Sequence, residues 1–468
     1  MASSIQQAQP PLEFIPPHLN LPLVRLLQAF LPVIMATQTA IREVEAENVD
    51  TLVDLYRQFQ AGKVRFLMAF RHPSTDDPIC LAYLLSRLVP QAARQQGVRL
   101  RSPIHAHFIY DRGIPLWAGA RMGWLYSRLG GTPIQRGKID RAGLRSARDL
   151  FVNGQLPMAA APEGATNGHN ELVSPLEPGI SQLGFWCVED LRAAGRPETV
   201  LLLPLGIKYR YLTPPWQQLE QLLTELETET GLTDPTTNHS LEEAVLYQRL
   251  FRLGEHLLSR MEDFYTRFYH QTLPTMTTPT APDRLADTAP NQIFADRLNA
   301  LLDVALTVAE QYFGLPPKGS LIDRCRRLEQ AGWDWIYRDD INLGTLPPMD
   351  RGLADLIAQE AHLRLWHMRL VESFVAVTGQ YVREKPSVER FAETTLLMWD
   401  MVARIKGNNA FKRPKLGPQT ALLTIGQPLS VSDRWSAYEG GRRNAKQAIA
   451  DLTQDLQTSL EEMAQAEG

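Results

Sequence analysis

The stretch VRFLMAFRHPSTDDP, residues 64–78, decides the fold. Its first seven residues form a short apolar run, which predicts a buried β-strand, and Pro78 stands where a helix can begin. The turn between the strand and the helix carries His72 and Asp77, five positions apart. Functional groups in α/β proteins are often carried on such turns, so this stretch predicts both an α/β fold and the location of a site.

The same alternation of short apolar runs and helical patterns continues to residue 212, which favours α/β architecture. The expected strands are 64–70, 104–110, 156–161 and 200–207, and the expected helices are 78–95, 117–129, 141–152 and 179–195. Pro204 lies inside the last apolar run. Because proline cannot donate to a strand ladder, we expect that strand at an edge of the sheet or at a bulge.

Beyond residue 215 the pattern changes. Residues 217–272 and 290–406 have apolar residues at the spacing of amphipathic helices, and a Thr/Pro-rich linker separates them. Residues 421–431 return to a β-like pattern, which a last helical stretch follows. We therefore expect an N-terminal apolar helical segment (1–60), an α/β core (61–215), a helical insertion or second domain (216–415), and a returning strand with a C-terminal helix (416–468).

Composition narrows the function classes. A chain of 468 residues with 44% hydrophobic residues can bury more than one core. Its net charge of −4 gives no overall attraction to nucleic acid. Cys80, Cys187 and Cys325 lack CxxC spacing, which argues against a disulfide framework or a zinc knuckle and fits a reducing compartment.

The N-terminal run LPLVRLLQAFLPVIMA, residues 21–36, is strongly apolar. It contains Arg25 and Pro32 and is shorter than the roughly 20 residues that cross a bilayer. The residues before it do not form a secretion signal. The run therefore predicts either a helix that lies on a membrane surface or a helix packed on the protein's own core.

His72 and Asp77 have the chemistry of a general base with its partner. A histidine can take a proton from an alcohol near neutral pH, and a carboxylate on its other nitrogen stabilises the imidazolium that forms. The alternative is an ordinary polar turn in which Asp76 caps the helix. A further alternative is a metal hydrolase that adds His105 and His107, because alternate residues of a strand share one face.

Two more segments carry polar groups at expected turns. In LGGTPIQRGK (129–138), Arg136 and Lys138 place two cations beside a glycine-rich turn, which can bind a phosphate. In APEGATNGHNE (161–171), Glu163 follows a small apolar strand and is either an acceptor for a substrate hydroxyl or a turn carboxylate.

In their order along the chain, four segments resemble the four blocks of the glycerolipid acyltransferase superfamily, which is marked by an HxxxxD motif. The blocks are matched by RHPSTDD (71–77), GGTPIQR (130–136), PEG (162–164) and LLLPLGI (201–207). Arg71 stands where the family has asparagine, and the arginine of the third block is missing. The resemblance covers residues 60–212, and TIGQPL (424–429) is similar to the strand that follows the fourth block, which would make 216–415 an insertion.

The resemblance implies an α/β acyltransferase domain with a mixed sheet flanked by helices, plus a large all-helical region. The implied activity is that of a 1-acylglycerol-3-phosphate O-acyltransferase, which moves a fatty acyl group from acyl-CoA or acyl carrier protein to a lipid hydroxyl. The implied partners are this thioester donor, a lysophospholipid or glycerol-phosphate acceptor such as lysophosphatidic acid, and a membrane surface, without nucleic acid, metal or cofactor. The protein would be cytoplasmic and peripherally membrane-associated, and residues 21–36 would have the interfacial role.

The resemblance also assigns roles to residues. His72 would be the general base and Asp77 its orienting partner. Substrate would be bound by Ser74, Glu163, Gly164 and Arg136, with Arg71 and Lys138 as cations that replace the missing arginine of the third block. Another lipid alcohol or lysophospholipid as acceptor, and a non-catalytic lipid-binding scaffold, are the alternatives that this pattern leaves open.

Overall fold

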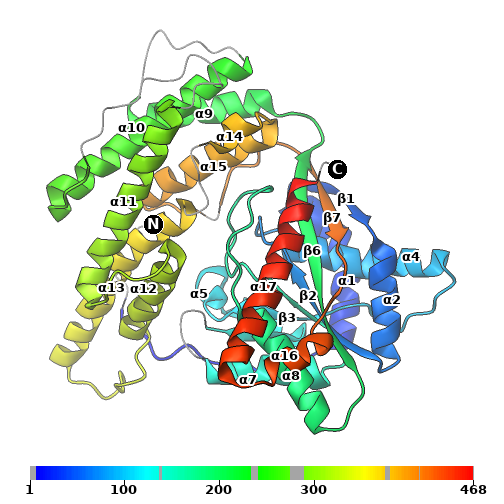
Figure 1. Ribbon diagram of the computed structural model, residues 1–468. Helices are drawn as coiled ribbons and strands as arrows, with labels where there is room; N and C mark the ends of the chain where they lie inside the picture. The colour runs from blue at the N-terminus through cyan, green and yellow to red at the C-terminus, as the bar shows by residue number, and fades with distance from the viewer. Residues whose placement is uncertain are drawn as a thin grey trace. The chain divides into compact units, whose positions relative to one another are not determined.

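The computed structural model describes residues 7–135, 140–232, 241–274, 289–374, 380–410 and 412–466. The chain forms two compact units, which are described separately (Figure 1). The α/β unit comprises Glu13–Leu212 and Pro418–Gly468, and the helical unit comprises Met1–Leu12 and Thr213–Gly417. The expected class, an α/β fold with a mixed sheet, flanking helices and a large helical region, is confirmed.

The α/β unit is built on an eight-stranded sheet. Its strands are β1 (Ile41–Glu47), β2 (Val64–Phe70), β3 (His107–Asp111), β4 (Gly131–Ile134), β5 (Met158–Ala160), β6 (Thr199–Tyr211), β7 (Gln419–Ile425) and β8 (Leu429–Ser430). The order is β1-β7-β6-β2-β5-β3-β4, with β8 beside β6. The strands from β6 to β4 in this order are parallel, whereas β7 runs antiparallel to β6. The chain leaves this unit after β6 and returns at β7, so the helical unit is an insertion.

Helices cover both faces of the sheet, which explains why every residue of β2 is buried and every one except Arg65 is apolar. One face packs against α1 (Leu21–Gln38), α2 (Val49–Gln60), α3 (Asp77–Tyr83), a π-helical turn (Leu84–Leu88) and α4 (Val89–Gln95). The other face packs against α7 (Arg141–Asn153), α8 (Gly179–Ala193) and α17 (Arg442–Gln465). Three shorter helices are α5 (Ile114–Ala118), α6 (Ala120–Arg128) and α16 (Trp435–Tyr438). Residues 1–60 were expected to form a separate helical segment. Residues 13–60 instead belong to the α/β unit, and they contain the strand β1 between the helices α1 and α2.

Pro204 corrects the expected position of its strand. β6 is not an edge strand, because it lies between β2 and β7. The Pro204 carbonyl accepts a hydrogen bond from Gly426 N at 3.0 Å, so the side of Pro204 that lacks an N–H faces the break between β7 and β8. The sheet therefore tolerates proline here because the neighbouring strand is interrupted at that residue.

The helical unit consists of α9 (Trp216–Thr230), α10 (Glu243–Tyr269), α11 (Ala289–Phe313), α12 (Leu321–Ile336), α13 (Pro348–Phe374), α14 (Tyr381–Glu384) and α15 (Val388–Ile405). Buried arginines join neighbouring helices. Arg249 of α10 pairs with Glu220 and Glu227 of α9, and Arg297 of α11 pairs with Glu255 and Glu262 of α10. The carboxylates compensate the cost of burying each guanidinium charge, and the pairs fix the register between the helices.

Candidate active site

The site lies where β2 and β5 end. Both strands are parallel neighbours, so the residues that follow them meet at one edge of the sheet. His72 follows β2, and Glu163 follows β5 in the β5–α8 loop, residues 161–178. Sites in open α/β sheets lie beyond the carboxyl ends of the strands, and this edge also holds the first and third blocks of the sequence prediction.

His72 and Asp77 form a hydrogen-bonded pair. Nδ1 of His72 lies 2.8 Å from Oδ2 of Asp77. The Asp77 side chain is fully buried, whereas 22% of the His72 side chain is exposed. Because an ionised carboxylate only accepts hydrogen bonds, Nδ1 of a neutral His72 carries the proton and Nε2 carries the lone pair. Within the described residues, no protein group hydrogen-bonds Nε2.

The Asp77 carboxylate is held by two further donors. Ser74 N donates to Oδ2 at 2.9 Å, and the Tyr209 hydroxyl donates to Oδ1. Burial raises the pKa of Asp77, and the hydrogen bonds from His72, Tyr209 and Ser74 act in the opposite direction. Three donors therefore offset part of the cost of keeping this carboxylate ionised away from water.

The turn between β2 and α3 places Ser74 and Asp76 in structural positions. Ser74 Oγ accepts a hydrogen bond from Asp76 N at 3.2 Å, which closes the turn. Asp76 occupies the N-cap position of α3, but its side chain makes no capping hydrogen bond. Ser74 Oγ and the Asp77 carboxylate therefore both accept hydrogen bonds from the backbone of the turn, and the contact of Ser74 with substrate stays a prediction.

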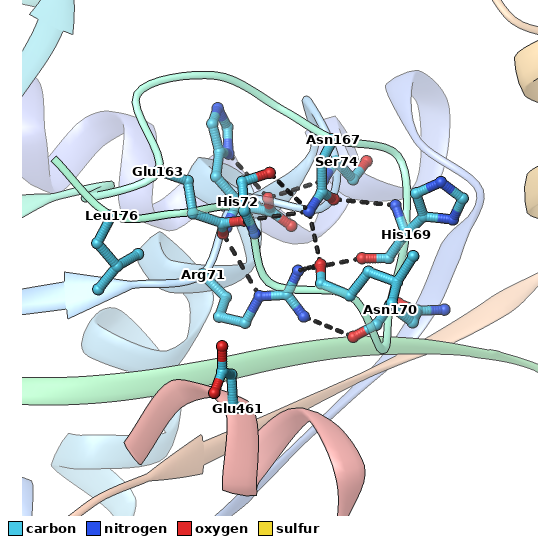
Figure 2. Close-up of polar contacts among 12 residues, drawn as sticks. Arg71, His72, Ser74, Glu163, Asn167, His169, Asn170, Leu176 and Glu461 are labelled. Atoms are coloured by element: carbon cyan, nitrogen blue, oxygen red, sulfur yellow. Dashed lines mark hydrogen bonds and ion pairs between the residues drawn. The ribbon is translucent and has the colours of Figure 1, made fainter. Parts of the chain in front are cut away.

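Glu163 fixes the backbone of His72. It is buried, and its Oε1 accepts from His72 N at 2.8 Å, as Figure 2 shows. Its Oε2 accepts from Ser174 N at 2.9 Å and from Asn167 Nδ2 at 3.1 Å. Both oxygens are used by protein donors, so Glu163 positions the general-base candidate instead of contacting an acceptor as expected.

Arg71 is fully buried and has a different role from the expected phosphate ligand. Its Nε lies 3.4 Å from Glu163 Oε1. Its two Nη groups donate to the backbone carbonyls of His169, Asn170 and Leu172 at 2.6 to 3.1 Å (Figure 2). Four of its five N–H groups are thus occupied. The prediction that Arg71 replaces the missing phosphate ligand does not fit this structure, because the guanidinium shapes the β5–α8 loop.

Gly164 and the two remaining cations complete the predicted set. Gly164 has a φ of 76° and its N donates to Ala161 O at 3.3 Å, so this turn needs a residue without a Cβ. Gly164 therefore sets the direction of the loop after Glu163. Arg136 and Lys138 lie outside the described residues. They follow β4, which is parallel to β3, β5 and β2 and ends at the same edge of the sheet.

Tyr209 and Asn170 are site residues that the sequence prediction missed. The Asn170 amide pairs with the backbone of Tyr209, with Nδ2 to Tyr209 O at 2.9 Å and Tyr209 N to Oδ1 at 2.8 Å. Burial raises the pKa of Tyr209 well above its ordinary value, and the nearby Asp77 adds to this shift. The signal was present in the sequence: Tyr209 alternates with Leu205 and Ile207 on one face of β6, and a tyrosine at a core position needs a partner for its hydroxyl.

His105 and His107 both bind backbone carbonyls. Nε2 of His105 lies 3.0 Å from Leu129 O, and Nδ1 of His107 lies 3.0 Å from Gly130 O. Burial lowers the pKa of His105 to about 4 and also lowers the pKa of His107. The two rings fix the turn before β4. In the described part of the chain, no group of three or more His, Cys, Asp or Glu side chains is arranged to hold a metal ion.

This arrangement can remove a proton from an alcohol. A partly exposed imidazole whose other nitrogen is bound to a buried carboxylate has the parts of a general base. No described serine, threonine or cysteine hydrogen-bonds Nε2, so the alcohol would come from a substrate.

No family model, no curated protein sequence and no solved structure matches the chain.

Proposed function

We propose that this protein is an O-acyltransferase that moves a fatty acyl group from a thioester to a hydroxyl of a glycerol-phosphate lipid, with lysophosphatidic acid as the first acceptor to test. The observation that carries the proposal is the His72–Asp77 pair, in which Nδ1 is bound and Nε2 has no protein partner. The order of four sequence segments that resemble the glycerolipid acyltransferase blocks supports the same activity.

In the proposed reaction, Nε2 of His72 takes the proton of the acceptor hydroxyl as its oxygen attacks the thioester carbonyl. The carbon–sulfur bond then breaks and a new ester forms. The imidazolium gives its proton to the leaving thiolate, which departs as a free thiol. Asp77 stabilises the imidazolium between these steps, and no acyl group is attached to the protein.

The surface of α1 supports a lipid acceptor. One face of this helix buries Leu31 and Met35, whereas Leu26, Phe30 and Val33 on its other side are more than half exposed. By length and composition, α1 is the single helix of the described residues that could cross a membrane. The helix also packs against α3, which begins with Asp77. We propose that this apolar face lies on a membrane, so the protein acts there as a peripheral cytoplasmic enzyme.

The phosphate of the acceptor requires a cation that Arg71 cannot supply. Because Arg71 is enclosed by Glu163 and loop carbonyls, we assign this role to Arg136, with Lys138 as a second cation. If neither binds phosphate, the acceptor is a neutral lipid alcohol or a lysophospholipid whose phosphate is not recognised. Acyl-CoA and acyl carrier protein thioesters are the donors to compare.

The test is acyl transfer by the purified chain on lipid vesicles, with both donors and a panel of acceptors, read by mass spectrometry. Acylation of a lyso-acceptor is expected, and His72→Ala is expected to reduce it about 10²- to 10⁴-fold. His18→Ala is the matched control, because His18 is an exposed histidine of the same unit. Activity that survives His72→Ala contradicts the base assignment, and no transfer to any acceptor favours a lipid-binding scaffold.

A further inference from the structure

We infer that Tyr209 is a positioning residue of the His72–Asp77 pair, which it controls through a hydrogen bond to Asp77. This inference rests on the proposed function and extends it to a residue from a distant strand. Tyr209 lies on β6, 132 positions after Asp77 in the sequence. Its hydroxyl donates to Oδ1, the oxygen that His72 does not use.

The surroundings of the Tyr209 hydroxyl point to a single proton arrangement. Asp77 and Tyr209 are both buried, and the Cys80 thiol, one turn into α3, lies 3.7 Å from the Tyr209 oxygen. Burial raises the pKa of Tyr209 and of Cys80, so both stay protonated at neutral pH. The hydroxyl therefore donates to the carboxylate.

The chain fixes Tyr209 from its backbone as well as from its side chain. β2 pairs with β6 as far as Leu205, so in the described part of the chain no strand pairs with Tyr209 on that side. The Asn170 amide fills this position with two hydrogen bonds to the Tyr209 backbone. Arg71 in turn holds the carbonyls of the loop that carries Asn170. Arg71, the residue before His72, thus holds the β5–α8 loop, and Asn170 of that loop holds the backbone of Tyr209.

The hydrogen bond from Tyr209 to Oδ1 changes the electrostatic interaction between Asp77 and His72. By donating to Oδ1, Tyr209 favours the ionised form of the buried Asp77 and draws negative charge away from Oδ2. Less charge at Oδ2 weakens the attraction between Asp77 and the imidazolium of His72. Tyr209 therefore lets His72 release its proton to the leaving thiolate more readily than a carboxylate without a second partner would.

Other titratable groups near the pair do not replace this contact. Asp76 is the N-cap residue of α3 and Cys80 lies on that helix, and Cys80 contacts Tyr209 rather than the carboxylate. Glu163 lies on the other side of His72 and accepts from its backbone, and Arg71 faces Glu163. Of the groups that hold the pair, removing the Tyr209 hydroxyl therefore changes only the hydrogen bonding of Asp77, and it also removes the contact with the Cys80 thiol.

The experiment compares Tyr209→Phe with Tyr56→Phe in the full chain. Tyr56 is the matched control, because it is a buried tyrosine of the same unit whose hydroxyl donates to His105 O at 3.0 Å, away from the pair. Two readouts are needed: the pKa of the His72 ring from NMR of ¹³C-labelled histidine, with His72→Gln for assignment, and the pH profile of kcat/KM for acyl transfer.

Tyr209→Phe is expected to raise the pKa of His72 by about half to one unit, which corresponds to part of a hydrogen bond to a charged group. The acidic limb of kcat/KM moves upward by the same amount. A ring-fluorinated tyrosine at position 209, with a more acidic hydroxyl, moves both midpoints downward. Tyr56→Phe is expected to lower the melting temperature about as much as Tyr209→Phe does. It should move neither the pKa of His72 nor the acidic limb of kcat/KM.

An unchanged pKa of His72 in Tyr209→Phe, together with the same loss of melting temperature as in Tyr56→Phe, overturns the inference and makes Tyr209 a structural residue only. The two claims fail separately. If the wild-type chain transfers no acyl group, the proposed function fails, whereas the NMR titration still decides whether Tyr209 controls His72.

Discussion

The buried ion pair of Arg71 and Glu163 connects the turn after β2 to the loop after β5. Neither side chain is exposed, and both are surrounded by hydrogen-bond partners from this loop or from His72. Breaking such a pair leaves a buried charge without compensation, which costs far more than losing a surface pair. The pair therefore determines whether His72 and the loop keep their relative positions.

Arg71→Lys separates a structural role from a phosphate-binding role. Lysine keeps the charge but not the planar fork that holds the three carbonyls, so we expect a loss of about 3 kcal/mol in the free energy of unfolding and a lower kcat. Thermal unfolding and steady-state kinetics measure the two effects. A stable variant whose only defect is a higher KM for the lipid acceptor would show that Arg71 binds phosphate after all.

The residue scale also shows what the sequence could predict of the site. His72 and Asp77 are five positions apart, so one strand-to-helix turn brings them together and their pairing could be expected. Glu163 was predicted as a site residue, but its contact with the His72 backbone depends on the neighbouring position of β5. Asn170 and Tyr209 meet only through the fold, and no local pattern joins them.

At the scale of elements, strands were predictable where burial makes them apolar. β2 was expected at 64–70 and spans Val64–Phe70, because both of its faces are buried. β1 was missed because most of its side chains are not buried and its sequence, IREVEAE, alternates with charges. β4 was missed because GTPI contains residues typical of turns, although Gly131 allows the Phe108 ring to pack closely.

The exposed apolar face of α1 gives a prediction for this element. Replacing Leu26, Phe30 and Val33 together by glutamine should weaken binding to lipid vesicles at least tenfold, because each side chain would lose part of roughly 1.5–3 kcal/mol of transfer free energy. Stability in solution should change little, since all three are exposed. Vesicle sedimentation measures the binding.

The control for α1 is an equal change on another helix. Met349, Leu353 and Leu356 of α13 are at least half exposed, and their replacement by glutamine removes the same kind of surface from the helical unit. This triple variant should bind vesicles as the wild type does. Equal loss from both triple variants would contradict a specific role for α1 and indicate general surface hydrophobicity.

At the scale of the whole molecule, each unit contains a histidine whose enclosed ring resists protonation. Burial lowers the pKa of His105 in the α/β unit and of His367 in the helical unit to about 4. The unfolded chain, with an ordinary histidine pKa near 6.5, binds more protons than the folded chain between these values. Stability should therefore fall as pH decreases from about 6.5 to about 4, by roughly 3 kcal/mol for each histidine.

His105→Gln tests this acid sensitivity in the α/β unit. The glutamine amide can still donate to Leu129 O but does not titrate, so the slope of stability against pH between 6.5 and 4 should become shallower. Denaturant unfolding at a series of pH values measures the slope. An unchanged slope would assign the acid sensitivity to other groups, and His367→Gln makes the same comparison for the helical unit.

The division of the chain was visible in the sequence as a change of pattern near residue 215 and a return to a β-like run after residue 416. No such pattern in the sequence showed to which unit the residues before Glu13 belong. Ala8 is buried, and Gln9 exchanges backbone hydrogen bonds with Ile336 and Arg338, so the segment before Glu13 belongs to the helical unit. A short polar segment that pairs with the end of a distant helix carries no periodic signal.

The central claim is that His72 and Asp77 act as one general-base unit, and a double-mutant cycle on kcat/KM for acyl transfer tests it most directly. His72→Ala alone should lose about 10²- to 10⁴-fold, and Asp77→Asn alone should also lose activity, because asparagine cannot stabilise the imidazolium. The account predicts that the double variant is no slower than His72→Ala alone, since Asp77 acts only through His72. Losses that multiply in the double variant would contradict it.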